Sequence, residues 1–186
     1  MSGNPDGPRC QESSAGGDAG GGWAGRGGAP VRLEMVSDPM FLSGAREMVA
    51  AVARRVGLTD AAAGQVALAV DEALCNVMRH GYGRRADGTI WLALTPVRDG
   101  EQAGTRAGIR IVIEDEARQV EPEQIRSRDL ADVRPGGLGV HIIREVMDSA
   151  VYEKREGGVG MRLTMEKFVG GKSPCGCGPA GCGVTP

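Results

Sequence analysis

Aromatic side chains are scarce in this sequence, which has two Trp, two Tyr and two Phe among 186 residues. So few rings cannot form the stacking platform on which proteins bind single-stranded bases. Neither sign of charge is in excess, because the formal net charge at pH 7 is only −2. A balanced charge provides no general attraction to nucleic acid or to an anionic membrane. We therefore expect neither as a direct partner.

Long apolar runs are also missing. No run reaches the roughly 18–20 residues that a membrane helix requires, and the N-terminal residues lack the apolar stretch of a secretory signal. The five cysteines do not form a disulfide framework, since Cys10 and Cys75 stand alone and three others crowd the last dozen residues. Those three fall one ligand short of a tetrahedral metal site, unless Cys10 or a second chain supplies the fourth. We expect a cytoplasmic protein with free thiols.

The 31 glycines are concentrated at the two ends of the chain. Residues 1–30 and 170–186 are rich in Gly, Ala, Ser and Pro and cannot bury enough apolar area to offset the entropy of ordering. We expect both to be disordered tails. The intervening residues 31–169 are long enough for one domain with a sizeable core.

The apolar periodicity in this region predicts an α+β domain. Asp38 and Thr59 are typical N-caps for two helices, and Gly57 ends the first. Strands are expected at 31–37, 89–97, 108–115, 150–156 and 160–167, and helices at 39–56, 60–80 and 138–149. Successive hairpins require antiparallel pairing. We therefore expect a two-layer sandwich in which a mixed, mostly antiparallel sheet carries its helices on one face.

The second predicted helix carries a carboxylate and an amide one turn apart. Glu72 and Asn76 lie four residues apart, so both side chains fall on one face at the edge of the apolar stripe. A partly desolvated carboxylate suits a general base, and an amide oxygen suits Mg²⁺. The same spacing also occurs on ordinary solvated helix faces.

Two further motifs follow. Asp115 ends an apolar strand, where a carboxylate can accept a hydrogen bond from an exocyclic amine, although Asp also forms turns after strands. Gly136, Gly137 and Gly139 surround the start of the third helix, where exposed backbone N–H groups attract anions. Arg134 stands just ahead and can place a cation on a phosphate. A flexible loop with an ordinary helix start is the plainer alternative.

In this order the three motifs resemble the ATP-binding fold shared by gyrase, Hsp90, histidine kinases and MutL. More closely, DEALCNVMRHGYG and GGLGVHIIREVMDSAVYEK resemble boxes of the bacterial anti-sigma factor serine/threonine kinases of the SpoIIAB and RsbW type. The resemblance covers nearly all of 31–167. It implies binding of ATP with Mg²⁺, phosphorylation of a serine on a STAS-type anti-anti-sigma factor, binding of a sigma factor, and a homodimer.

The resemblance also implies roles for individual residues. Glu72 would activate the serine hydroxyl, Asn76 would hold Mg²⁺, and Asp115 would bind the adenine amine. Arg134 would act on the γ-phosphate. The nucleotide would further contact His80, Ala117, Gly136, Gly137, Leu138 and Gly139.

One departure weakens the resemblance at the adenine site. The family has D-x-G-x-G after the strand, whereas Ala117 and Gln119 replace the two glycines here. An added methyl, or the loss of positive φ, can push the backbone into the base site.

Two alternatives to a kinase stay open. One is a non-catalytic module that binds a partner, and the other is a simple ATP hydrolase, which the lack of a transducer domain disfavours.

Overall fold

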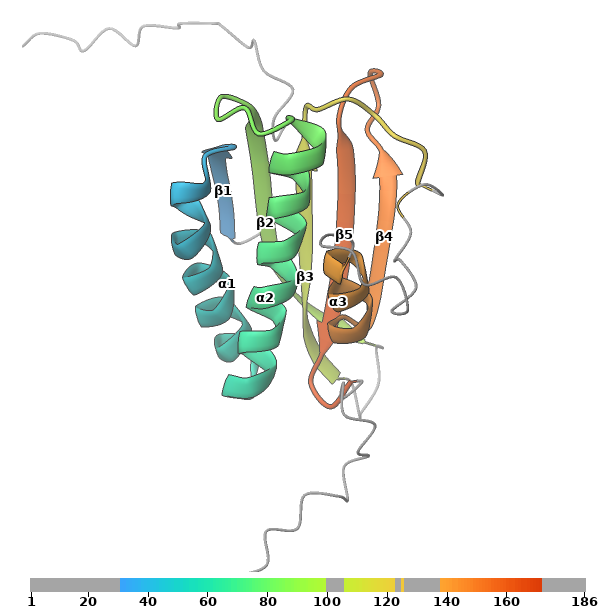
Figure 1. Cartoon of the computed structure of the whole chain (residues 1–186). Coiled ribbons are helices and arrows are strands. Elements are labelled where there is room, and N and C mark those ends of the chain that lie inside the picture. The colour runs from blue at the N-terminus through green and yellow to red at the C-terminus, as the bar shows by residue number, and fades with distance from the viewer. Residues whose placement is uncertain (1–30, 100–105, 123–124, 126–137, 172–186) are drawn as a thin grey trace, which may run out of the picture.

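The computed structural model describes residues 31–99, 106–122, 125 and 138–171 (Figure 1). This part of the chain forms five strands and three α-helices. The strands are β1 (Val31–Val36), β2 (Thr89–Asp99), β3 (Arg106–Asp115), β4 (Ser149–Lys154) and β5 (Met161–Phe168). The helices are α1 (Leu42–Val56), α2 (Asp60–Asn76) and α3 (Leu138–Val146), with short turns η1 (Pro39–Phe41) and η2 (Val77–Gly81). The two predicted tails lie almost wholly outside the described residues.

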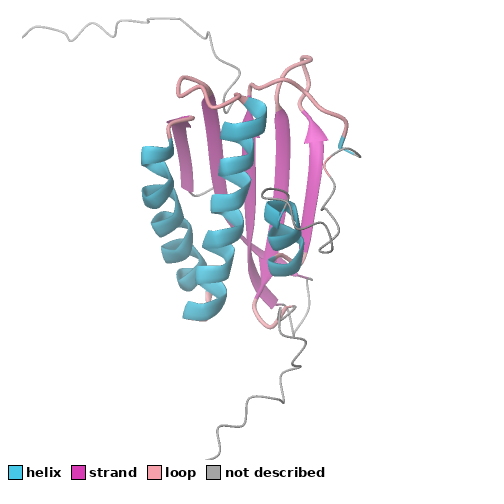
Figure 2. Cartoon of the chain, viewed as in Figure 1, coloured by secondary structure: helices cyan, strands magenta, loops and turns pink. Residues whose placement is uncertain are grey.

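The five strands form one sheet in the order β1-β2-β3-β5-β4, and every neighbouring pair is antiparallel. The three helices cover one face of this sheet (Figures 1 and 2). The register aligns Leu92 with Ile113 and Ile113 with Leu163, so apolar side chains form a continuous row beneath the helices. The predicted two-layer α+β sandwich is confirmed.

Local capping sets the first two helices. The Asp38 carboxylate accepts a hydrogen bond from the Met40 N–H at 2.9 Å, and the chain then makes one 3-10 turn before α1. Gly57 ends α1 at a φ of 107°. The Thr59 hydroxyl accepts from the Ala62 N–H at 3.2 Å and starts α2. Each of these caps was expected from the sequence.

Helix α2 is the central helix of the layer and packs against both α1 and α3. Its buried residues are mostly Ala and Val, which lets the helices approach closely. They are Ala63, Val66, Ala67, Ala69, Val70, Ala73 and Leu74. Beneath them the sheet contributes fully buried Ile and Leu side chains, each worth about 1.5–3 kcal/mol of transfer free energy.

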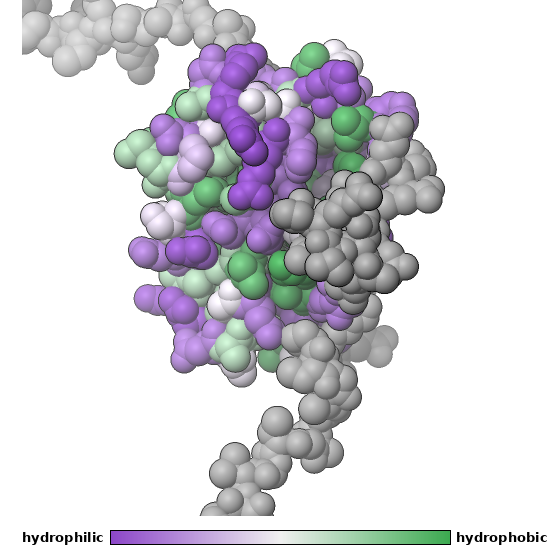
Figure 3. All heavy atoms as spheres, viewed as in Figure 1, coloured by the Kyte–Doolittle hydropathy of each residue, from purple (hydrophilic) through white to green (hydrophobic). Residues whose placement is uncertain are grey.

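None of the described helices combines the length and apolarity that crossing a bilayer demands. The helical face is largely hydrophilic (Figure 3).

Two helix ends differ from the predictions. The second helix does not continue as α-helix to His80, because the chain widens after Asn76 into a π turn. Such turns leave the i→i−4 pattern and occur often at functional sites. The third helix ends at Val146 rather than residue 149. The Asp148 carboxylate accepts a hydrogen bond from the Phe168 N–H at 2.8 Å, which draws the chain onto β5.

The opposite face of the sheet carries polar side chains in place of helices. Trp91 is nevertheless only 5% exposed, because the Arg155 guanidinium lies 4.9 Å from its ring centroid. The indole N–H donates to Glu34 on the edge strand at 2.9 Å. Glu114 on the same face pairs with Arg162 at 2.6 Å.

Gly160 allows the turn between β4 and β5 to lie directly against β3. Its φ is 79°, and an added Cβ would overlap the carbonyl oxygen of Asp115. Gly157 in the same turn also has a positive φ, 94°, but faces open space. We expect Gly157→Ala to cost about 1–2 kcal/mol from backbone strain alone. Gly160→Ala should cost about 1–3 kcal/mol more, because the overlap adds to the strain. Urea unfolding of both variants measures this difference, and equal losses would contradict the close approach.

Candidate functional site

Gly139, in the first turn of α3, brings two of the sequence motifs together. An added Cβ at this position would lie 2.7 Å from Glu72 Oε2 and 3.2 Å from Asn76 Nδ2. A side chain at 139 would have to push the Glu72 carboxylate aside, so the backbone of α3 lies close to the two side chains. The first motif and Gly139 of the third motif therefore meet at one place in the fold.

Glu72 and Asn76 are both half-buried on the exposed edge of α2. Within the described part of the chain, neither side chain makes a hydrogen bond or an ion pair with another residue. A carboxylate and a carboxamide oxygen thus remain available to a ligand. No cluster of three or more His, Cys, Asp or Glu is placed to hold a metal in the described residues. The oxygens of Glu72 and Asn76 fit Mg²⁺ instead, because this ion usually takes one or two protein oxygens and completes its shell with phosphate and water.

Asp115 is 4% exposed at the end of β3. Its Oδ1 accepts hydrogen bonds from the Ala117 N–H at 2.8 Å and the Met161 N–H at 3.2 Å. Burial raises the pKa of this carboxyl, and the two backbone donors only partly offset that rise. The other carboxylate oxygen, Oδ2, accepts no hydrogen bond from a described residue. Oδ2 is also not fully buried. One oxygen is therefore fixed while solvent reaches the other, which is free to accept from a ligand.

Ala117, the first departure from the family pattern, packs against Gly81. An added Cβ on Gly81 would lie 2.9 Å from the Ala117 methyl, which is itself buried. The absence of a side chain at 81 therefore provides the space that the methyl occupies. Since Gly81 ends η2, which follows Asn76 directly, this turn links the α2 pair to the Asp115 segment.

Tyr82 strengthens the same link and was not singled out by the sequence. Its hydroxyl donates to the Thr89 carbonyl at 2.5 Å and accepts from the Glu116 N–H at 2.8 Å. Burial raises the pKa of this phenol, so it stays protonated near neutral pH. The only available signal was the Gly81-Tyr82-Gly83 run, which indicated a helix end and nothing more.

The remaining predicted residues are placed less fully. His80 lies exposed on η2. Leu138 opens α3, but its side chain is outside the described residues, as are Arg134, Gly136 and Gly137. Their predicted contacts with phosphate stay predictions.

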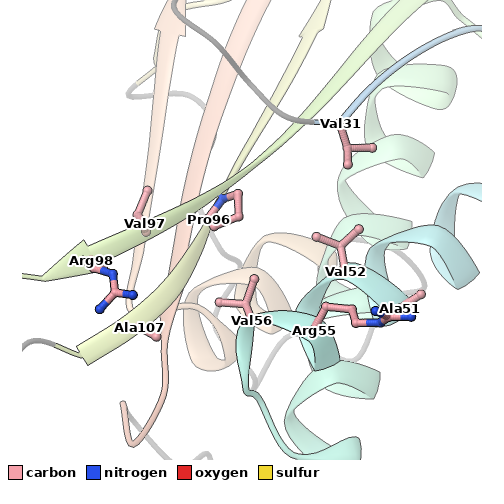
Figure 4. Close-up of a pocket in the computed structure, with 9 residues that line it drawn as sticks. All are labelled: Val31, Ala51, Val52, Arg55, Val56, Pro96, Val97, Arg98 and Ala107. Carbon is pink, nitrogen blue, oxygen red and sulfur yellow. The ribbon is translucent and has the colours of Figure 1, made fainter.

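A separate groove of about 560 Å³ lies between the end of α1 and the far ends of β2 and β3 (Figure 4). Its lining is apolar apart from two arginines. The residues are Val31, Ala51, Val52, Arg55, Val56, Pro96, Val97, Arg98 and Ala107. Ala107 and Asp115 stand at opposite ends of β3, so this groove is distinct from the candidate site.

Comparison with known proteins decides the family. Residues 35–167 match the family model described as the histidine kinase-like ATPase domain. The chain belongs to this family. Its match spans β1 to β5 and therefore includes Glu72, Asn76, Asp115 and Gly139.

Two curated relatives of this histidine kinase-like ATPase domain are named as kinases. Serine-protein kinase RsbW of Listeria monocytogenes is 25% identical over 143 residues, which cover 76% of this chain and 88% of that protein. Serine/threonine-protein kinase BtrW of Bordetella bronchiseptica is 31% identical over 101 residues, which cover 52% of this chain and 66% of that protein. The expected resemblance to RsbW is confirmed.

One solved structure has lower similarity. The histidine kinase domain of the Erythrobacter litoralis EL346 blue-light activated histidine kinase is 19% identical. The alignment covers 68% of this chain and 58% of that chain, with a TM-score of 0.36.

The contact at Gly139 makes a testable contrast with Gly64, a glycine of α2 that has open space around its Cβ position. Gly64→Ala should stabilise the protein by about 0.5–1 kcal/mol through helix propensity. Gly139→Ala must in addition displace the carboxylate of Glu72, so we expect its free energy of unfolding to lie about 0.5–1 kcal/mol below that of Gly64→Ala. Urea unfolding measures both. Stabilisation by the two variants alike would show that α3 does not lie against the α2 pair.

Proposed function

We propose that this protein is an ATP- and Mg²⁺-dependent serine/threonine kinase that phosphorylates a serine of a STAS-type anti-anti-sigma factor. By this proposal it also binds a sigma factor, acts as a homodimer and works in the cytoplasm. The observation that carries the proposal is the placement of Gly139 against Glu72 and Asn76. The names of the relatives support it, since both are protein kinases.

The proposed chemistry assigns one task to each group. Glu72 accepts the proton of the attacking serine hydroxyl, and its half-buried setting keeps it near the protein surface where a partner's serine arrives. Asn76 holds Mg²⁺, which neutralises phosphate charge when bound. Asp115 Oδ2 accepts a hydrogen bond from the adenine amine. Arg134 and the backbone at 136–139 contact the terminal phosphates, with His80, Ala117 and Leu138 lining the nucleotide. Positioning and charge neutralisation then promote transfer.

A non-catalytic binding module is the second candidate, and the altered residues Ala117 and Gln119 favour it. Calorimetry with ATP and Mg²⁺ separates the two. Saturable binding that requires Mg²⁺ supports the kinase, whereas no heat at millimolar nucleotide supports the module.

Glu72 provides the test of catalysis. Glu72→Gln keeps the shape of the side chain but cannot accept a proton, so transfer from labelled ATP to a cognate STAS-type protein should fall about 10²–10⁴-fold. ATP affinity should stay within about twofold, because the loss is confined to the transition state. Asp71→Asn, at the neighbouring acid of α2, is the matched control and should retain activity. Transfer by Glu72→Gln at the wild-type rate would refute the assigned role.

Asp115→Asn should separate stability from binding. Asn can still accept from the Ala117 and Met161 N–H groups, but it presents an amine where Oδ2 would meet adenine. ATP affinity should fall about 10–100-fold, as expected for a lost hydrogen bond to a charged group. Calorimetry measures this loss.

The same variant has a defined pH dependence. Because burial raises the pKa of Asp115 in the folded state, the folded protein holds this proton more tightly than the unfolded chain does. The contribution of Asp115 to stability therefore decreases as pH rises from its unfolded pKa through its folded pKa. Asp115→Asn removes this titration and should gain stability relative to wild type over that window. Urea unfolding of both proteins at several pH values measures this change, and a difference in stability that stays constant with pH would contradict the assignment.

A further inference from the structure

The segment at 115–119 is held by the turn between β4 and β5, and both lie at the same end of the sheet (Figure 1). The Gly160 N–H donates to the Ala117 carbonyl at 2.7 Å. The Met161 N–H donates to Asp115 Oδ1 at 3.2 Å, and Arg155 Nη1 donates to the Asp115 carbonyl at 2.6 Å. Three hydrogen bonds from one turn thus hold this segment, and two of them fix the side chain and the backbone carbonyl of Asp115.

Gln119 adds a fourth hydrogen bond to the same turn. Its side-chain Nε2 donates to the Arg155 carbonyl at 2.7 Å. The family pattern has glycine at this position, which has no side chain to make such a bond. The second departure from the pattern therefore replaces backbone freedom with a specific contact.

Arg155 is itself held in one orientation. Its backbone N–H donates to the Gly160 carbonyl at 3.1 Å and closes the turn. Its guanidinium stacks over Trp91, whose indole donates to Glu34. The group that donates to the Asp115 carbonyl is thus anchored at both its backbone and its side chain.

We propose that Gln119 and Arg155 are positioning residues that hold the Asp115 carboxylate in the orientation that selects a nucleobase with an exocyclic amine. This inference rests on the proposed function, in which Asp115 binds adenine. A carboxylate fixed before binding does not lose conformational freedom when the base arrives, so affinity and selectivity both gain. Gln119 thereby adds a side-chain contact at a position where the family pattern has a flexible glycine.

The test compares Gln119→Glu and Gln119→Gly with a control in the same part of the fold. Gln119→Glu keeps the size of the side chain but presents an oxygen to the Arg155 carbonyl. Gln119→Gly restores the family residue. Lys154→Ala is the matched control, because it removes an exposed ion pair with Glu121 at 2.6 Å without touching 115–119.

Calorimetry in Mg²⁺ gives the dissociation constants for ATP and for inosine triphosphate, which carries a carbonyl in place of the amine. We expect wild type and Lys154→Ala to prefer ATP equally. Both Gln119 variants should bind ATP about three- to tenfold more weakly, the range of one hydrogen bond, and should bind inosine triphosphate as well as wild type or better. Arg155→Lys, which keeps the charge over Trp91 but loses the guanidinium fork, should shift the preference in the same direction.

Three results would overturn the proposal. An unchanged ATP preference in both Gln119 variants would show that the contact does not position Asp115. Equal losses for both nucleotides would show a purely structural role, which thermal unfolding of each variant would register as a lower Tm. If wild type binds neither nucleotide, the proposed function fails as well, so its failure is distinguished from failure of the positioning role alone.

Discussion

The approach of α3 to α2 at Gly139 is the constraint on which the candidate site depends. A glycine there lets a helix backbone lie against a carboxylate and a carboxamide with no intervening side chain. The small residues of α2 serve the same end, because a helix lined with Ala and Val packs closely against both neighbours. Helix α2 therefore contributes to both the core and the site. Its buried face packs against the neighbouring elements, and its edge carries Glu72 and Asn76.

Much of the fold follows from local chemistry in the sequence. Asp38, Gly57 and Thr59 set helix ends through bonds to residues within four positions, and such signals are visible without a structure. The two errors at helix ends arose where the sequence pattern alone carries no signal. Asp148 leaves α3 because it bonds to a residue 20 positions away, which no periodicity reveals. The π turn after Asn76 likewise keeps an apolar pattern that an α-helix would also satisfy.

The same distinction between local and long-range signals separates the site residues that were predicted from those that were missed. Glu72, Asn76 and Asp115 stand in recognisable motifs, and the structure places them around η2 and α3. Tyr82 and Arg155 were missed because their bonds to this region span 34 and 40 residues. Arg134, Gly136 and Gly137 lie outside the described residues, so their roles still rest on resemblance alone.

The indole of Trp91 gives this arrangement an optical consequence. It is the only tryptophan of the described residues, since Trp23 lies outside them, and a cation lies over its ring. That cation also bonds to the carbonyl of the residue proposed to bind adenine. Small displacements of the strand end must therefore change the electric field at the ring. We therefore expect the emission of Trp91 to respond when the proposed adenine site is filled, on top of a contribution from Trp23 and without any attached dye.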